Sequence, residues 1–139
     1  MIVDFFRHGS GLSKGCLDYL LGEEREREHA QVLSGDVKLT AQLIDSSPFA
    51  KKYTSGCLSF YEHDLSDQDK QQIMQNFEEC LFPGLDKDQY QILWVQHQDK
   101  VNQDTGETRL ELNFVIPNVE LSTGKRLQPF YAPVDLDRV

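Results

Sequence analysis

The sequence predicts a single α+β domain in which helices pack on one face of an antiparallel or mixed central sheet. Helix and strand patterns are interspersed along the first part of the chain, whereas the last part holds only strand and hairpin patterns. Hydrophobic residues make up 39% of the 139 residues and aromatic residues 10%, which is enough to build a core. No repeat or linker divides the chain, so we assign residues 1–139 to one domain.

Strands are predicted where β-branched and aromatic residues cluster or alternate with polar residues. Five segments have this pattern: 2–6, 30–33, 53–60, 90–97 and 109–116. Asp104-Thr105-Gly106, between the last two segments, is typical of a hairpin turn. Ser122-Thr123-Gly124 predicts one more hairpin, which pairs residues 119–121 with 126–131.

The first helix is predicted over residues 16–21, because apolar residues there recur at helical spacing and Gly22 follows them. In this helix Tyr19 points away from the apolar stripe that contains Leu17 and Leu21. The next segment, 23–28, alternates acidic and basic residues, which is typical of a solvated surface.

Two further helices are predicted from the same apolar spacing. One covers residues 38–46 and stops before Pro48. The other begins after Ser66, which we expect to be its N-cap, and continues to the Pro83-Gly84 pair.

The composition excludes several classes of protein. The chain has 23 acidic and 14 basic residues, a net charge of −9, whereas duplex DNA binding depends on Lys and Arg that neutralise phosphates. Cys16, Cys57 and Cys80 match neither a disulfide framework nor a zinc site, so we expect reduced thiols. The sequence has no signal-peptide pattern and no apolar run of roughly 20 residues, so we expect a soluble cytoplasmic protein without a membrane partner.

The hairpin around residue 105 carries a possible metal-ligand set. Glu111 and Asn113 alternate along one strand and therefore project from the same face. A three-residue turn would place His97 opposite Asn113, whereas a two-residue turn would place it opposite Phe114 and break the cluster. One imidazole, one carboxylate and one amide oxygen suit Mg²⁺ or Mn²⁺ better than zinc. An ordinary solvent-facing strand is the alternative interpretation.

Several segments together carry a resemblance that spans essentially the whole chain. They are Met1-Ile2-Val3-Asp4-Phe5-Phe6, Asp18-Tyr19-Leu20-Leu21-Gly22, Tyr53-Thr54-Ser55-Gly56, Leu81-Phe82-Pro83-Gly84, Ile92-Leu93-Trp94-Val95-Gln96-His97, Glu111-Leu112-Asn113-Phe114-Val115-Ile116-Pro117-Asn118 and Gly124-Lys125-Arg126-Leu127-Gln128-Pro129. In this order they resemble the N-terminal domain of plasmid mobilisation relaxases of the colicin-plasmid type. The resemblance implies the fold of the HUH endonucleases. Because family members usually continue well beyond this domain, it also implies that residues 1–139 are the N-terminal part of a longer protein.

The resemblance also implies a chemistry. This subgroup of HUH relaxases holds its metal with His, Glu and Asn, and the matching residues here are His97, Glu111 and Asn113. Tyr19 matches the nucleophilic tyrosine of the family, which attacks a DNA phosphate and leaves a 5′-phosphotyrosine and a free 3′-hydroxyl. The implied protein is bacterial and plasmid-encoded, uses Mg²⁺ or Mn²⁺, nicks one strand at a transfer origin and works with relaxosome accessory proteins. Two acids are candidates for orienting the histidine or taking the tyrosine proton: Asp99 and Glu62.

Single-stranded DNA binding would need a cationic groove with aromatic or apolar platforms. Basic residues near the first helix and the last hairpin are the candidates: Arg7, Lys14, Lys125 and Arg126, with His8, Lys51 and Lys52 as further possibilities. Two other functions stay open at this point. One is a non-catalytic DNA-binding or partner-binding domain derived from a relaxase, and the other is a replication initiator that uses the same tyrosine chemistry.

Overall fold

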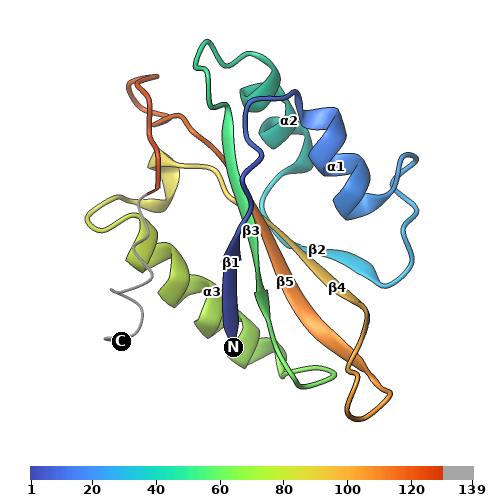
Figure 1. Cartoon of the computed structure of the whole chain (residues 1–139). Coiled ribbons are helices and arrows are strands. Elements are labelled where there is room, and N and C mark those ends of the chain that lie inside the picture. The colour runs from blue at the N-terminus through green and yellow to red at the C-terminus, as the bar shows by residue number, and fades with distance from the viewer. Residues whose placement is uncertain (130–139) are drawn as a thin grey trace.

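A five-stranded antiparallel sheet forms the centre of the molecule, with the strand order β1-β3-β5-β4-β2 (Figure 1). The structure is a computed structural model that describes residues 1–129. The strands are β1 (Ile2–Phe5), β2 (Ala30–Ser34), β3 (Tyr53–Ser59), β4 (Leu93–Val101) and β5 (Thr108–Pro117). All four strand pairs are antiparallel, so the predicted α+β class is confirmed and the sheet in the described region is not mixed.

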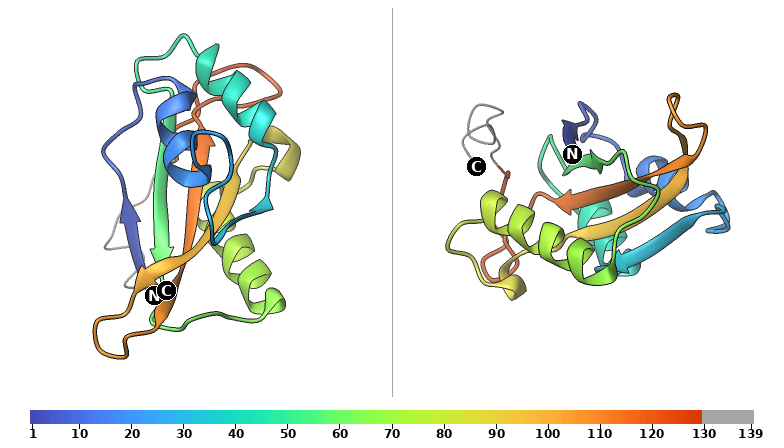
Figure 2. Two further views of the ribbon diagram at one scale, coloured as in Figure 1. Left: turned by 90° about the vertical axis from the view of Figure 1, so that its right-hand side faces the viewer. Right: turned by 90° about the horizontal axis from the view of Figure 1, so that it is seen from below.

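The helices cover both faces of the sheet, so the prediction of helices on one face was wrong. On one face lies α3 (Asp67–Leu81), and on the other lie α1 (Ser13–Leu21) and α2 (Val37–Asp45) (Figure 2). Alternate residues of β4 and β5 feed the two cores: Trp94 and Phe114 face α3, whereas Val95 and Val115 face the other two helices. The central strands are therefore buried on both faces.

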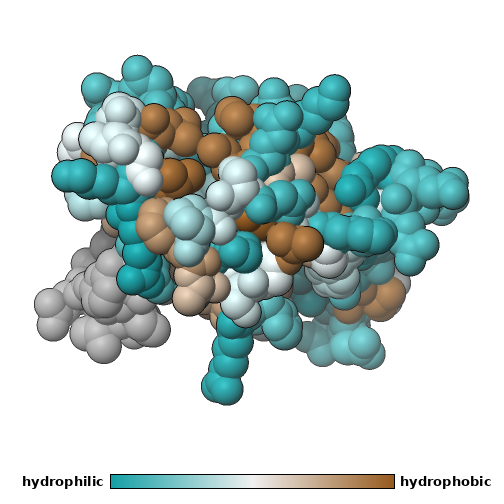
Figure 3. Space-filling view, turned by 90° about the horizontal axis from the view of Figure 1, so that it is seen from above, coloured by the Kyte–Doolittle hydropathy of each residue, from teal (hydrophilic) through white to brown (hydrophobic). Residues whose placement is uncertain are grey.

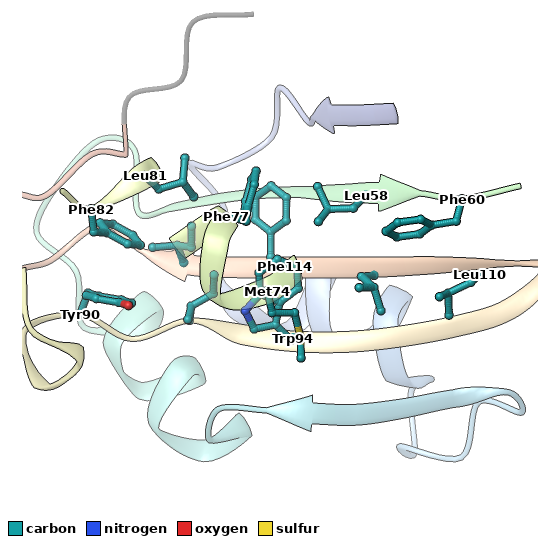
Figure 4. Packing of buried hydrophobic residues seen from close by; sticks show 13 residues of the cluster. Leu58, Phe60, Met74, Phe77, Leu81, Phe82, Tyr90, Trp94, Leu110 and Phe114 are labelled. Carbon is teal, nitrogen blue, oxygen red and sulfur yellow. The ribbon is translucent and has the colours of Figure 1, made fainter. Parts of the chain in front are cut away.

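The core beneath α3 is rich in aromatic rings (Figure 4). The Phe77 ring lies 4.9 Å from that of Phe114 and 5.7 Å from that of Trp94, measured between centroids. Ser66 caps the helix as predicted, with its side chain accepting from the Asp69 amide at 3.1 Å.

The core beneath α1 and α2 fixes the position of the helix that carries Tyr19. Leu17, Leu20 and Ile44 pack there against the sheet. The carboxylate of Asp45, at the end of α2, accepts from the Ser13 amide and the Ser13 hydroxyl, each at 2.8 Å. This tertiary cap lets α1 begin three residues earlier than the apolar spacing predicted.

Three further segments differ from the sequence prediction. β4 begins at Leu93 rather than at residue 90, because a short 3₁₀ helix, η1 (Lys87–Gln89), occupies the approach to it. The expected last hairpin is reduced to one bridge, between Val119 and Arg126, and residues 130 and 131 of its second strand lie outside the described residues. No helix in residues 1–129 combines the length and apolar character needed to cross a membrane.

Candidate functional site

The predicted ligand residues share the sheet face that α1 covers. His97 on β4 is paired directly with Glu111 on β5, and Asn113 lies two residues further along β5, opposite Val95. On the other side of β5, Ser59 and Cys57 of β3 are the partners of Glu111 and Asn113. The three residues are therefore brought together on one face, as the sequence predicted.

The pairing register was predicted wrongly, although the shared face was predicted correctly. His97 was expected opposite Asn113, but it lies opposite Glu111. The hydrogen bonds of Asn102 with Glu107 and Gly106 leave a loop of four residues, 103–106, which shifts the pairing by one. A bulge in β4 between His97 and Lys100 shifts it by one more. Because strand side chains alternate with a period of two, the two shifts together preserve the face.

His97 presents one free nitrogen to the site. Its side chain is fully buried, and Nε2 lies 2.7 Å from the main-chain oxygen of Leu20 on α1. A carbonyl oxygen can only accept, so Nε2 carries the proton, and the neutral ring then leaves a lone pair on Nδ1. Nδ1 is buried and has no hydrogen-bond partner. Burial lowers the pKa of His97, which favours the neutral ring that a metal requires, although the bond to Leu20 opposes the shift.

Glu111 and Asn113 supply the oxygen donors. Glu111 is 7% exposed, and its Oε2 accepts from the Ser59 hydroxyl at 3.3 Å and lies 3.5 Å from Arg109 Nη1. Asn113 is 2% exposed, and its amide nitrogen donates to the Val95 carbonyl at 3.3 Å, so the amide oxygen is the atom available to a ligand. Residues 1–129 contain no group of three or more His, Cys, Asp or Glu side chains arranged to hold a metal. A site here would depend on the asparagine.

Tyr19 of α1 contacts one member of this group, His97. Its ring meets that of His97 edge to face, with centroids 6.1 Å apart. Tyr19 is nevertheless 49% exposed, because it points away from the buried Leu17 and Leu21 of α1, as its helical position predicted. A half-exposed tyrosine beside a buried imidazole can be reached by a large substrate.

Arg27 also contacts the tyrosine. Its guanidinium lies 5.1 Å from the centre of the Tyr19 ring and donates to the Tyr19 carbonyl at 2.5 Å. Two further guanidinium nitrogens donate to Asp99 Oδ2, at 2.9 and 3.1 Å. Burial opposes ionisation of Asp99, but the hydrogen bonds and charge of Arg27 outweigh it, and the pKa of Asp99 lies below its ordinary value.

Arg27 was missed because it lies in a segment predicted to be solvated surface. It is separated from Asp99 by 72 positions, and no local pattern connects the two residues. Of the two acids proposed to assist Tyr19, Asp99 is thus engaged with Arg27, and its Oδ1 is buried without a partner. Glu62 is an exposed residue beyond the end of β3.

The predicted DNA-binding residues divide into two groups. Arg7 is exposed in the loop between β1 and α1, and Lys14 is exposed in the first turn of α1, where its Nζ pairs with Asp18 at 2.5 Å. Lys125 and Arg126 are exposed in the segment after β5, which is tied to η1 by the amide of Leu121 and lies away from α1 (Figure 1). The structure therefore does not bring all four together.

The three cysteines should differ in reactivity. Burial raises the pKa of Cys16 to about 11 and also raises that of Cys57, whereas Cys80 is exposed on α3. Because the thiolate is the reactive form, iodoacetamide at pH 8 is expected to modify Cys16 at least about tenfold more slowly than an ordinary exposed thiol. Peptide mass spectrometry over a time course measures this. Equal rates at Cys16 and Cys80 would contradict the burial of Cys16.

Two curated proteins are similar to this chain over its whole length. A "Cryptic plasmid protein C" of Neisseria gonorrhoeae is 57% identical over 139 residues, which is 100% of this chain and 64% of that protein. A "DNA relaxase MbeA" of Escherichia coli is 55% identical over 139 residues, which is 26% of its own length. The chain thus spans less than two thirds of either relative.

The other two comparisons gave no match. No protein-family model matches the sequence, and no solved structure matches the chain. The similarity to a protein named a DNA relaxase agrees with the resemblance in the sequence.

Proposed function

We propose that this chain is the nicking domain of a plasmid mobilisation relaxase, which cleaves one strand of transfer-origin DNA through a covalent tyrosine intermediate. The observation that carries the proposal is the contact of the Tyr19 ring with the buried His97, directly beside Glu111 and Asn113. The similarity to a protein named a DNA relaxase supports it.

The donor set fits a divalent metal. An unpartnered, buried Nδ1 of His97, a carboxylate oxygen of Glu111 and an amide oxygen of Asn113 are the atoms that would hold Mg²⁺ or Mn²⁺. When bound, the ion would supply positive charge to a phosphate, which is of value in a protein whose net charge is −9. The Leu20 carbonyl fixes the tautomer that leaves Nδ1 free.

The chain's own residues supply the nucleophile and its orientation. The Tyr19 hydroxyl oxygen attacks phosphorus, the 3′-oxygen leaves, and a phosphotyrosine ester remains at the 5′ side. The bond is exchanged rather than hydrolysed, so the 3′-hydroxyl can reverse the reaction. Arg27 restricts the Tyr19 ring and its main chain, which favours attack in a defined direction.

The test is the formation of a covalent protein–DNA adduct. The 139-residue chain is incubated with single-stranded oligonucleotides that tile a plasmid transfer origin, in the presence of Mn²⁺, and resolved under denaturing conditions. The proposal expects one oligonucleotide to yield an adduct that is lost in EDTA. DNA binding without any adduct on any oligonucleotide would contradict it and would favour the non-catalytic binding domain.

Replacement of Arg27 by Ala is expected to slow adduct formation by about 10–100-fold at saturating DNA, because the Tyr19 ring and its carbonyl lose their neighbour. Arg27→Lys keeps the charge and should recover part of the rate. Arg25→Ala is the matched control, since Arg25 lies in the same segment and pairs with Asp18 instead. Equal single-turnover rates for the Arg27 and Arg25 variants would show that Arg27 does not position the tyrosine.

A further inference from the structure

A pocket of about 850 Å³ is lined in part by Tyr19. It lies between β1, α1 and the start of β3, and its walls include the aromatic side chains of Phe6, His8, Tyr19 and Tyr53, together with Leu12 and Cys16. Figure 3 looks onto the end of the molecule that carries the loop between β1 and α1, where apolar residues lie between polar ones. Nothing in the proposed chemistry uses this pocket apart from Tyr19.

The loop that forms one wall is held in place by main-chain contacts. The Gly9 carbonyl accepts from the amides of Lys52 and Tyr53, at 2.6 and 3.1 Å. A Cβ atom at Gly9 would lie 2.4 Å from the Tyr53 carbonyl oxygen, so this close approach requires glycine. The pocket is therefore a built feature of the fold and not a gap beside a loose loop.

The lining is suited to a nucleobase. It offers rings for stacking, and none of its residues is an Asp or Glu, although the chain as a whole carries a charge of −9. Arg7 and Lys14 are exposed and adjacent in sequence to lining residues, although Lys14 is paired with Asp18, and the Lys51 side chain lies against Gly9. Rings with basic neighbours and no acid in the lining are the features that bind single-stranded DNA.

We propose that this pocket holds the base of the nucleotide next to the phosphate that Tyr19 attacks. The inference rests on the proposed nicking function and adds to it a place where one base is bound. Tyr19 belongs both to the pocket and to the contact with His97, so a strand whose phosphate lies at the tyrosine has a neighbouring nucleotide within reach of the pocket.

Gly15 provides a way to fill the pocket without disturbing the fold. It lines the pocket from α1, and a Cβ atom there would meet no heavy atom within 4 Å. Leucine is also a better helix former than glycine, so Gly15→Leu should not lower stability. Gln72→Leu, on the exposed surface of α3, adds a similar apolar group elsewhere and serves as the control.

Fluorescence anisotropy with labelled dT20, in EDTA so that no cleavage occurs, measures the effect on binding. Gly15→Leu is expected to weaken binding by at least about fivefold, the lower end of what one stacked base contributes, and Gln72→Leu should bind as the unmodified chain does. Thermal unfolding of each variant checks that it is folded. Binding by a folded Gly15→Leu chain equal to that of the unmodified chain would overturn the proposal.

A second arm locates the base. Abasic sites are placed one at a time in the oligonucleotide that forms the adduct, or in the tightest-binding one if none does. One abasic site, next to the scissile phosphate where cleavage occurs, should weaken binding by the unmodified chain but cause no further loss in Gly15→Leu. If the abasic site weakens binding equally in both proteins, the pocket assignment is overturned. It is also overturned if unlabelled thymidine monophosphate displaces labelled dT20 as effectively as unlabelled dT20 does. An adduct without the pocket effect would refute only the pocket, and the pocket effect without an adduct would refute only the nicking function.

Discussion

Replacing Tyr19 by Phe is expected to abolish the covalent adduct with DNA, with a loss of at least about a thousandfold in the rate of strand cleavage. The substitution removes one oxygen atom and keeps the ring that lies against His97 and Arg27. Because Tyr19 is 49% exposed and its hydroxyl forms no hydrogen bond with the described residues, stability should be unchanged. Denaturing electrophoresis of the labelled oligonucleotide measures the adduct, and mass spectrometry of the digested adduct identifies the modified residue.

Tyr61 provides the matched control for this substitution. It is 70% exposed, follows β3 and takes no part in the site, so Tyr61→Phe should form the adduct at the rate of the unmodified chain. Cleavage by Tyr19→Phe would show that another group is the nucleophile. Loss of the adduct together with retained binding of the uncleaved strand would place the effect of Tyr19 on the chemical step.

The shared face of Glu111 and Asn113 could be predicted from the sequence because alternate residues of a strand project from the same face. Glu111 and Asn113 are two positions apart on one strand, and no loop geometry can separate their faces. The partner of His97, in contrast, depends on the length of the loop and on the bulge before Lys100, and neither is encoded in the turn residues alone. The prediction of the face was correct because two single-residue shifts compensate each other.

Features that depend on distant parts of the chain could not be predicted. The start of α1 at Ser13 is set by Asp45 of α2, which is 32 positions away. Glu78 of α3 is 9% exposed and accepts from Tyr90 and Trp94, which are 12 and 16 positions away. These pairings satisfy buried polar groups across the fold, and a periodicity argument for one helix contains no information about them.

The negative charge of the chain is a poor guide to this face of the molecule. The pocket beside Tyr19 has no acidic residue in its lining, and the carboxylates closest to His97 are engaged, Asp99 with Arg27 and Glu111 with Ser59 and Arg109. Repulsion of a DNA strand by the remaining acids is long-ranged and screened by salt, whereas the contacts proposed here are short-ranged.

Substitution of the proposed ligand residues should weaken metal binding, and this effect should be measurable in the absence of DNA. His97→Ala and Glu111→Gln are each expected to weaken Mn²⁺ binding by about 10–100-fold or more. Loss of a residue that only supports a metal ligand already lowers metal affinity by that factor. Isothermal titration with Mn²⁺ in the absence of DNA measures the affinity. Adduct formation by Glu111→Gln should recover in part when Mn²⁺ is raised, because the weakened site is then filled by mass action.

Two comparisons separate a ligand role from a structural one. His97 is fully buried and bonded to Leu20, so His97→Ala should also lower the free energy of unfolding, by roughly 1–3 kcal/mol, whereas Glu111→Gln keeps the volume of the side chain. His63→Ala, at an exposed histidine bonded to Thr108, should leave Mn²⁺ affinity unchanged. If Glu111→Gln and His97→Ala both bind Mn²⁺ as the unmodified chain does, the paired positions on β4 and β5 do not form a metal site, and the role of His97 is confined to its contacts with α1.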